Sequence, residues 1–273
     1  MKNVGYIFKI FPLIFLLIFT NSCGDGEDPG PGGSPGNTPP RTADDVRADF
    51  QALTINPGVN DLILESIVAG TFWKFRIIAP TDASASNKRP MIMRLHGGAS
   101  AVTEYYKNTG CLAEPGLASL NAYIVSPNSD GSLWYANQNV VQVQALVDLV
   151  QTYLHVDTSK VAVMGYSDGG NGSWFFSQYL PQLFSAAIPM ASSYAVTNTS
   201  GVTHQFAKPI YAIHGESDQL FSLATTQGYV NETVDAGSDV TFVVANGLEH
   251  YNSCNYVSYL QGAASWLENT VWN

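Results

Sequence analysis

Short apolar runs without strict alternation constrain the fold of this chain more than any other feature. They lie at residues 91–95, 122–126, 160–165, 186–191, 209–214 and 240–245, and such runs are typical of strands buried on both faces of a parallel sheet. Helix-like segments at residues 140–155, 169–180, 223–236 and 254–270 alternate with them. Two earlier apolar runs, at residues 62–68 and 72–79, flank a turn and predict an antiparallel hairpin. The sequence therefore predicts an α/β fold with a mostly parallel, eight-stranded sheet and helices on both faces.

The composition excludes two broad classes of protein. Hydrophobic residues make up 45% of the chain and charged residues 12%, which is about half the usual charged share and too apolar for a disordered chain. The 12 Lys and Arg residues stand against 22 Asp and Glu, which gives a net charge of -10. A surface of that sign repels phosphate backbones, so we expect no nucleic-acid partner.

The amino terminus has the features of a bacterial secretion signal. Lys2 and Lys9 precede an apolar run at residues 10–19, which covers roughly half of a ~30 Å hydrocarbon core and is therefore too short to span a membrane. Residues 20–23 resemble a bacterial lipoprotein signal, although Thr20 stands where Leu is usual. We expect a signal peptide at residues 1–22 and a lipid on Cys23. The alternative is an ordinary signal peptide with an incidental cysteine.

A spacer follows this signal. Residues 24–41 hold eleven Gly or Pro among eighteen positions, a composition that cannot bury enough apolar surface to fold. We expect residues 23–41 to be a lipidated Cys with a flexible linker and residues 42–273 to be one domain. Asp25, Glu27 and Asp28 resemble a surface-display signal of Bacteroidetes lipoproteins, with solubility as the alternative explanation. The expected location is extracytoplasmic, anchored by lipid to the outer membrane.

The segment Gly165-x-Ser167-x-Gly169 predicts a nucleophilic serine. A strand-like run ends just before it and a helix-like segment follows it. A serine on such a sharp strand-to-helix turn is exposed at the edge of the sheet, and the crowded turn demands small residues two positions either side.

The hydroxyl needs a base and the base needs an acid. Among five His residues, His250 alone lies after the last strand and before the last helix, the final position in the chain order Ser, acid, His. His96 and His214 end strands and are expected to shape turns. Asp218 follows a strand end between Ser167 and His250 and is the expected acid, with Glu216 as the alternative.

Backbone N–H groups are expected to form the oxyanion hole, one from Asp168 after the serine and one from Gly98 after the third strand. Ala99 is an alternative to Gly98. The side chain of Asp168 is expected to point outward, because a carboxylate facing the site would oppose a developing anion.

These motifs together resemble the α/β-hydrolase superfamily. They are His96-Gly97-Gly98, the segment at residues 165–170, the segment at residues 214–218 and the segment at residues 247–250. Trp174 and residues 181–187 are similar to carboxylesterase, feruloyl or acetylxylan esterase and polyhydroxybutyrate-depolymerase-like groups. The resemblance implies Ser167 as nucleophile, His250 as base and Asp218 as acid in a serine ester hydrolase without metal or other cofactor. Asp168 and the sequence before His250 depart from the usual pattern of those groups.

The pocket is expected to be open and aromatic. The connection at residues 192–209 is too short for a cap domain. Trp134, with Tyr135, is expected to form one wall, and Tyr166, Tyr194 and Tyr251 to line the cleft, with core packing as the alternative for each ring. A sugar-linked aromatic acid or an acetylated glycan would suit such a wall.

The two remaining cysteines predict a disulfide. With Cys23 lipidated, Cys111 and Cys254 are left in an oxidising compartment, and both lie in loops expected at the catalytic edge. Two free thiols are the alternative.

The sequence thus predicts an extracytoplasmic serine hydrolase of carboxylic esters, with esters on plant polysaccharides as one substrate class. A prolyl-oligopeptidase-like peptidase and a non-catalytic glycan-binding surface lipoprotein remain as alternatives. No metal site is expected, because His and acidic residues lack ligand spacing and no CxxC pair occurs.

Overall fold

The computed structural model describes residues 40–101 and 104–273. Pro40–Asn273 forms one compact unit. The predictions for the signal peptide, for Cys23 and for nearly all of the linker fall on residues 1–39, outside the described residues. No helix in the described ranges is long and apolar enough to cross a bilayer.

One eight-stranded sheet forms the centre of the domain, in the order β1-β2-β4-β3-β5-β6-β7-β8. Strands β1 and β2 pair antiparallel, as do β2 and β4, and every other neighbouring pair is parallel. The strands are β1 Gly58–Glu65, β2 Phe72–Ala79, β3 Arg89–Leu95, β4 Tyr123–Pro127, β5 Val156–Tyr166, β6 Ala186–Met190, β7 Ile210–Gly215 and β8 Val240–Ala245. The predicted α/β fold with a mostly parallel sheet is confirmed.

The first strand ends three residues earlier than the apolar run predicted. The Ser66 hydroxyl accepts a hydrogen bond from the Val68 N–H at 3.0 Å, and the Ser66 N–H donates to the Thr71 carbonyl. This side-chain turn bends the backbone away from the ladder, so Ile67 and Val68 belong to the hairpin loop.

The helices are α1 Ala43–Ala52, α2 Ala113–Leu117, α3 Asn137–Tyr153, α4 Asp168–Tyr179, α5 Leu223–Asp235 and α6 Val257–Trp266. Helices α3, α4 and α5 match the predicted segments to within three residues at each end. Helix α1 was not predicted, although Thr42 and Asp45 form a capping box at its start. Helix α6 begins later than expected because Ser253–Tyr256 forms a 3-10 turn.

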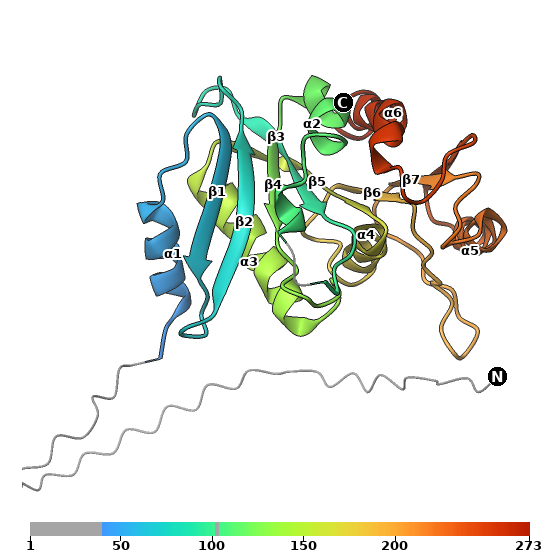
Figure 1. The fold of residues 1–273 in the computed structure, drawn as a ribbon, viewed down its shortest axis with the longest axis horizontal. Coiled ribbons are helices and arrows are strands. Elements are labelled where there is room, and N and C mark those ends of the chain that lie inside the picture. Colours follow the sequence, from blue (N-terminus) through green and yellow to red (C-terminus); the bar gives the residue numbers. More distant parts are fainter. Residues whose placement is uncertain (1–39, 102–103) are drawn as a thin grey trace, which may run out of the picture. The chain divides into compact units, whose positions relative to one another are not determined.

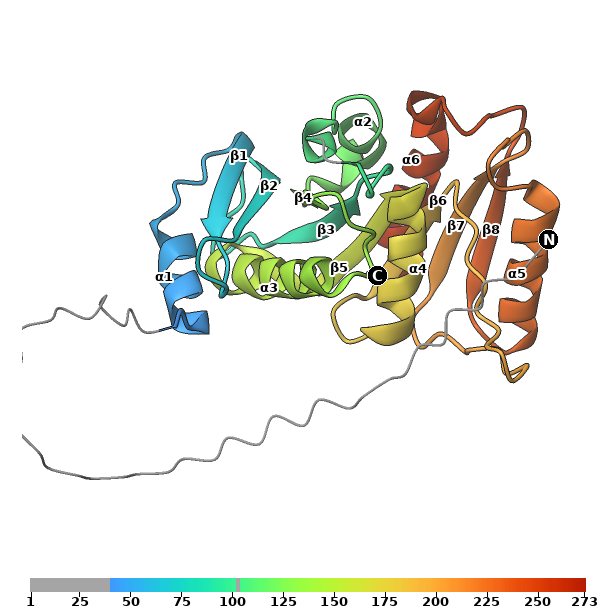
Figure 2. The same ribbon diagram turned by 60° about the horizontal axis from the view of Figure 1, so that its bottom comes forward.

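Helices cover both faces of the sheet (Figures 1 and 2), and an apolar core lies on each face. One core packs α1, α3, α4 and α5 against the sheet, and the other packs α2 and α6. Every residue of β4 and of β6 is buried, which explains why these runs lack alternation. The carboxyl ends of β3, β5, β7 and β8 meet at one edge, where the loops that carry His96, Ser167, Asp218 and His250 begin. No cap domain is inserted into the described residues.

Candidate active site

Ser167 occupies a strained turn between β5 and α4. Its φ is 57° and its ψ is -120°, a conformation that residues with a side chain rarely adopt. A side chain at Gly165 would overlap the backbone of Gly169, and one at Gly169 would overlap the carbonyl of Leu95. The strand and the helix therefore approach this closely only with glycine at both positions, and the serine hydroxyl is presented at the sheet edge.

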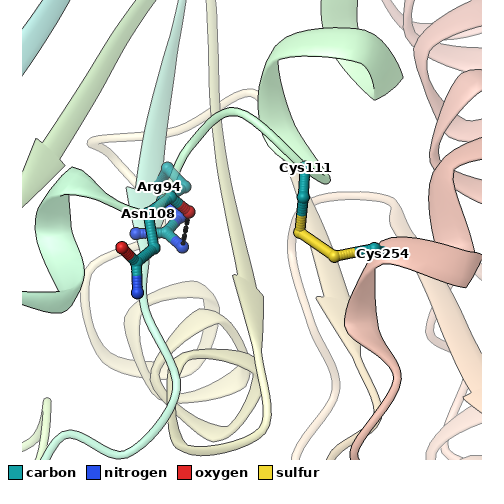
Figure 3. The surroundings of a disulfide bond; sticks show 4 residues. All are labelled: Arg94, Asn108, Cys111 and Cys254. Atoms are coloured by element: carbon teal, nitrogen blue, oxygen red, sulfur yellow. Dashed lines mark hydrogen bonds between the residues drawn. A yellow bond between two sulfur atoms is a disulfide. The ribbon is translucent and has the colours of Figure 1, made fainter.

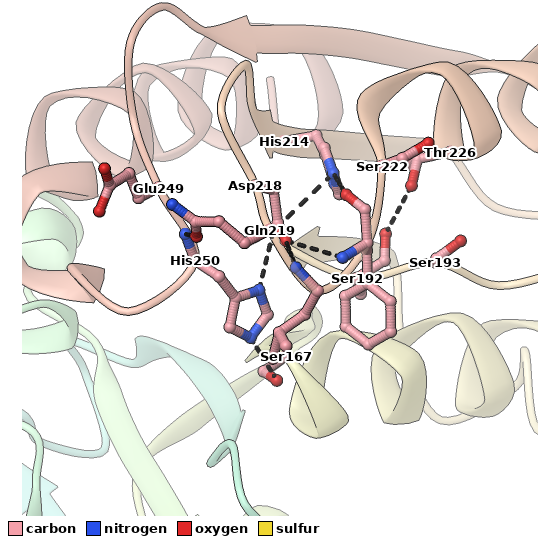
Figure 4. A network of polar contacts seen from close by, with 12 residues as sticks. Ser167, Ser192, Ser193, His214, Asp218, Gln219, Ser222, Thr226, Glu249 and His250 are labelled. Carbon is pink, nitrogen blue, oxygen red and sulfur yellow. Dashed lines mark hydrogen bonds and ion pairs between the residues drawn. The ribbon is translucent and has the colours of Figure 1, made fainter.

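Ser167, His250 and Asp218 form one chain of hydrogen bonds (Figure 4). The Nε2 atom of His250 lies 2.9 Å from the Oγ of Ser167, and its Nδ1 lies 2.8 Å from the Oδ2 of Asp218. The residues come from the ends of three different strands, in the order that the sequence predicted. Asp218 and His250 are buried, so water competes little for this chain.

The Asp218 carboxylate is held on its other oxygen as well. Oδ1 accepts the N–H groups of Leu220 and Phe221 at 2.9 and 2.8 Å. Behind it, the Nε2 of His214 lies 2.8 Å from the Phe221 carbonyl, to which it donates, and burial lowers the pKa of His214. A neutral His214 therefore stabilises the loop that carries Asp218, in line with the expectation that this histidine shapes a turn. The alternative acid, Glu216, instead accepts the N–H of Gly247 at 2.7 Å.

The backbone of His250 is fixed on both sides by side chains. Its N–H donates to the Oε1 of Gln219 at 3.2 Å, and its carbonyl accepts the hydroxyl of Tyr166 at 2.7 Å. Burial raises the pKa of Tyr166, so the phenol keeps the proton that it donates. The rings of Phe221 and Tyr251 pack against the imidazole with centroids 5.4 and 5.6 Å away.

The loop after β3 approaches the serine closely. A Cβ on Gly97 would lie 3.1 Å from the Tyr166 carbonyl oxygen and 3.2 Å from the Cβ of Ser167, and Gly98 has a φ of +62°. The Gly98 N–H donates to no acceptor among residues 40–101 and 104–273. The Asp168 N–H is the first of α4, where no preceding intrahelical carbonyl can accept it.

We expected the Asp168 side chain to point outward, and this expectation is wrong. Its Oδ2 accepts the N–H of Ala99 at 2.9 Å, so the carboxylate ties the start of α4 to the loop after β3. The Ala99 N–H is thereby occupied, which leaves Gly98 as the donor on this loop. The expectation was wrong because it weighed repulsion of an anion and omitted the unpaired N–H groups of a glycine-rich loop.

His96 and Trp134 fix the loop after β3 through hydrogen bonds. The Nδ1 of His96 donates to the Gly97 carbonyl at 2.8 Å, while its Nε2 accepts the N–H of Ser129 at 3.1 Å. Burial lowers the pKa of His96 to about 4, so the ring stays neutral and can accept at one nitrogen. Trp134 donates to the His96 carbonyl at 2.9 Å and is 1% exposed. The prediction that Trp134 lines the pocket was wrong, because Gly172 leaves room for the indole to pack inside.

Comparison with known proteins places the chain in a family. The sequence profile of the dienelactone hydrolase family matches residues 129–266, which is half of the chain and includes Ser167, Asp218 and His250. The chain belongs to the dienelactone hydrolase family. The family is one of hydrolases, and the predicted resemblance to α/β-hydrolase esterases is confirmed. A comparison with curated proteins found no match.

Solved structures share the fold of this dienelactone hydrolase family member at low identity. A thermostable esterase is 20% identical over 77% of this chain, with a TM-score of 0.64, and the chain spans 62% of that esterase. A fluorophosphonate-binding serine hydrolase of Staphylococcus aureus is 17% identical over 78% of this chain and 100% of its own, with a TM-score of 0.63. A truncated carbohydrate esterase from gut microbiota is 15% identical over 73% of this chain and 91% of its own, with a TM-score of 0.60.

The aromatic residues predicted for the pocket lie in different environments in the structure. Tyr251 is 71% exposed beside His250, and Tyr166 lies under the His250 backbone. Tyr194 stacks on Trp174 of α4 with an interplanar angle of 7°, and its hydroxyl donates to Gln178. The sequence did not indicate Tyr105, which is 38% exposed and whose ring covers Gly98. Its position over the loop after β3 depends on tertiary packing that no local pattern carries.

A disulfide joins Cys111 to Cys254 (Figure 3), with the Cα atoms 5.1 Å apart. It connects the segment after the β3 loop to the segment that follows His250. Arg94 supports the same segment by donating to the carbonyls of Tyr105 and Asn108 at 2.9 and 2.8 Å. Two loops at the site are thus covalently tied to each other. Among the described residues, no group of three His, Cys, Asp or Glu side chains could hold a metal ion.

Proposed function

We propose that this protein hydrolyses carboxylic esters through an acyl-enzyme on Ser167. The observation that carries the proposal is the continuous hydrogen-bond chain from the Oγ of Ser167 through His250 to Asp218. Membership of a hydrolase family supports the reaction class. The strained turn, the buried acid and the N–H groups of Gly98 and Asp168, which have no acceptor among the described residues, are further parts that acyl transfer requires.

The first half of the reaction transfers the acyl group to the enzyme. His250 Nε2 takes the proton of Ser167 as Oγ attacks the carbonyl carbon, and the carbonyl oxygen becomes an oxyanion. The N–H groups of Gly98 and Asp168 stabilise that charge. Collapse breaks the bond to the alcohol oxygen, and the alcohol leaves with the proton from His250.

The second half releases the acid. Water attacks the acyl carbon while His250 accepts a proton from the water. Collapse then breaks the bond between the acyl carbon and the Oγ of Ser167, and Oγ takes that proton back from His250. Asp218 accepts the Nδ1–H of His250 throughout and stabilises the imidazolium that forms in both halves.

A panel of nitrophenyl and feruloyl esters tests the proposal, with the Ser167→Ala variant as control. We expect turnover of short acyl or feruloyl esters and a loss of at least about 10³-fold in the variant. Turnover of aminoacyl-nitroanilides without turnover of any ester would favour the peptidase alternative. No turnover by the wild type would favour the non-catalytic alternative.

We also propose that the protein is secreted and lipid-anchored through Cys23. The disulfide between Cys111 and Cys254 supports an oxidising compartment. Metabolic labelling of expressing cells with an alkyne-tagged fatty acid tests the anchor. Labelling that disappears in Cys23→Ser is expected, and equal labelling of both proteins contradicts it.

A further inference from the structure

The solvent-facing side of α4 carries aromatic rings where a surface helix usually carries charges. Within this helix, the residues that are not buried are Asp168, Asn171, Phe175, Gln178 and Tyr179. They recur at three- and four-residue spacings and therefore form one stripe along the helix, here called the α4 stripe. The stripe begins beside Ser167, and after Asp168 it holds no charged side chain.

Tyr135 widens the stripe into an aromatic platform. It lies just before α3, which is next to α4 on the same face of the sheet (Figure 2), and it is 46% exposed. Its ring centroid is 6.1 Å from that of Phe175, which in turn is 4.9 Å from that of Tyr179. Tyr179 is 53% exposed. The three adjoining rings form one contiguous aromatic patch that reaches solvent, and contiguous apolar patches are where ligands commonly bind.

The two amides of the stripe are oriented by the protein through their oxygens. The Oδ1 of Asn171 accepts the N–H of Ser193 at 3.2 Å, and the Oε1 of Gln178 accepts the hydroxyl of Tyr194 at 2.7 Å. Within the part of the chain that the structure describes, neither NH₂ group donates to a protein acceptor. Each amide therefore offers fixed donors to a ligand oxygen beside the aromatic rings.

We propose that the α4 stripe, together with Tyr135, binds a neutral oligosaccharide chain that carries the scissile ester. A sugar ring has an apolar C–H face that stacks on an aromatic ring and a rim of hydroxyl groups that accept hydrogen bonds from amides. The lack of charge after Asp168 favours an uncharged sugar, and the net charge of -10 opposes an acidic polymer.

The α4 stripe leads toward Ser167, so a chain bound on it would place an ester near the serine. Phe175 lies seven residues after Asp168 on α4, which is about 10 Å along the helix axis. A chain stacked on Phe175 and Tyr179 therefore reaches Ser167 after a few sugar units. This inference rests on the proposed ester hydrolysis and adds the class of alcohol to it.

A second copy of the protein suits this surface less well. A stable protein interface buries about 800 Å² on each partner, whereas three partly exposed rings on one helix and one loop supply a small part of that area. A narrow, uncharged stripe that leads to the serine fits a chain-like ligand better than a flat partner.

Affinity electrophoresis of the full chain tests the inference. The Ser167→Ala protein is run through gels that contain arabinoxylan, galactomannan or mixed-linkage β-glucan, with polygalacturonate as the acidic polymer. We expect retardation by at least one neutral polysaccharide and none by polygalacturonate. Phe175→Ala/Tyr179→Ala should weaken binding at least tenfold. Phe72→Ala, which removes an aromatic ring of matched exposure, 51%, on the distant hairpin, should bind as before.

The inference would be overturned if no neutral polysaccharide retarded the protein or if the double variant bound as tightly as its parent. It would also be overturned if the parent protein were dimeric and the double variant monomeric, because the rings would then form a dimer interface. Labelling of the wild type by a fluorophosphonate probe separates this failure from failure of the proposed function, because labelling without polysaccharide binding refutes the stripe alone. Thermal unfolding monitors folding of the variants. If the double variant unfolds, Tyr179→Ser alone is used, because that ring lies mainly in solvent.

Discussion

Tyr166, the residue before the candidate nucleophile, donates its hydroxyl to the backbone carbonyl of the candidate base, His250, through a 2.7 Å hydrogen bond. Gln219 holds the other side of the same residue by accepting the His250 N–H at 3.2 Å. The imidazole reaches Ser167 from a loop, and loops shift more easily than strands. The two side chains therefore fix the distance on which proton transfer from the serine depends.

Tyr166→Phe is expected to lower kcat about fivefold with little change in KM, because loss of one buried hydrogen bond of about 1 kcal/mol loosens the base. Steady-state kinetics on a short nitrophenyl ester measures this. Tyr153→Phe, on α3 and away from the site, is the control and should match the wild type. A change in KM alone would show that Tyr166 contacts substrate and does not position His250.

Asp168 should respond differently to two substitutions. Asp168→Asn keeps an acceptor for the Ala99 N–H and removes a negative charge near the oxyanion, so kcat should rise several-fold. Asp168→Ala frees the loop that carries Gly98 and should lower kcat about tenfold. Single-turnover rates on a nitrophenyl ester measure both. A fall of equal size in the two variants would show that the charge itself is needed.

His96 should make stability depend on pH. Its pKa is about 4 in the folded protein, lowered by burial from 6.5, so the unfolded chain binds more protons between these values. The free energy of unfolding should therefore fall as the pH drops from 6.5 toward 4, by up to about 1.4 kcal/mol per pH unit. Urea unfolding at pH 7 and pH 5 measures the effect. His96→Asn should show a smaller difference, and an equal difference would assign the dependence to other groups.

Removal of the disulfide should destabilise the domain. The bond between Cys111 and Cys254 spans 143 residues, and a disulfide that constrains the unfolded chain typically contributes about 2–4 kcal/mol. Cys111→Ser/Cys254→Ser should lower the Tm by about 5–15 °C in calorimetry. The reduced wild-type protein is the control and should have the same Tm as the double variant. A Tm equal to that of the oxidised wild type would show that the bond adds no stability.

The fold could be predicted from the sequence because local patterns determine most of it. Fully buried strands such as β4 and β6 have largely apolar sequences without alternation. The apolar residues of α3 recur at three- and four-residue spacings in the sequence. The glycines at positions 165 and 169 reflect a turn that tolerates no side chain. Order along the chain was enough to select His250 and Asp218 as neighbours of Ser167.

The details that failed depend on contacts between distant segments. Trp134 follows a strand end, as a pocket residue could, but its burial follows from the His96 carbonyl and the space left by Gly172. The Asp168 carboxylate turns inward because of the Ala99 N–H, 69 positions away. The ring of Tyr105 covers Gly98 in a segment that is held by Arg94 and by the disulfide at Cys111. No local pattern records these pairings.

The mass of the protein after reaction with a fluorophosphonate tests the central claim most directly. Activated attack requires the hydrogen-bonded chain of Ser167, His250 and Asp218. We predict one covalent adduct per chain, located on the peptide that contains Ser167 and absent from Ser167→Ala and from His250→Ala. An unmodified wild-type protein, or an adduct on another residue, would contradict the account.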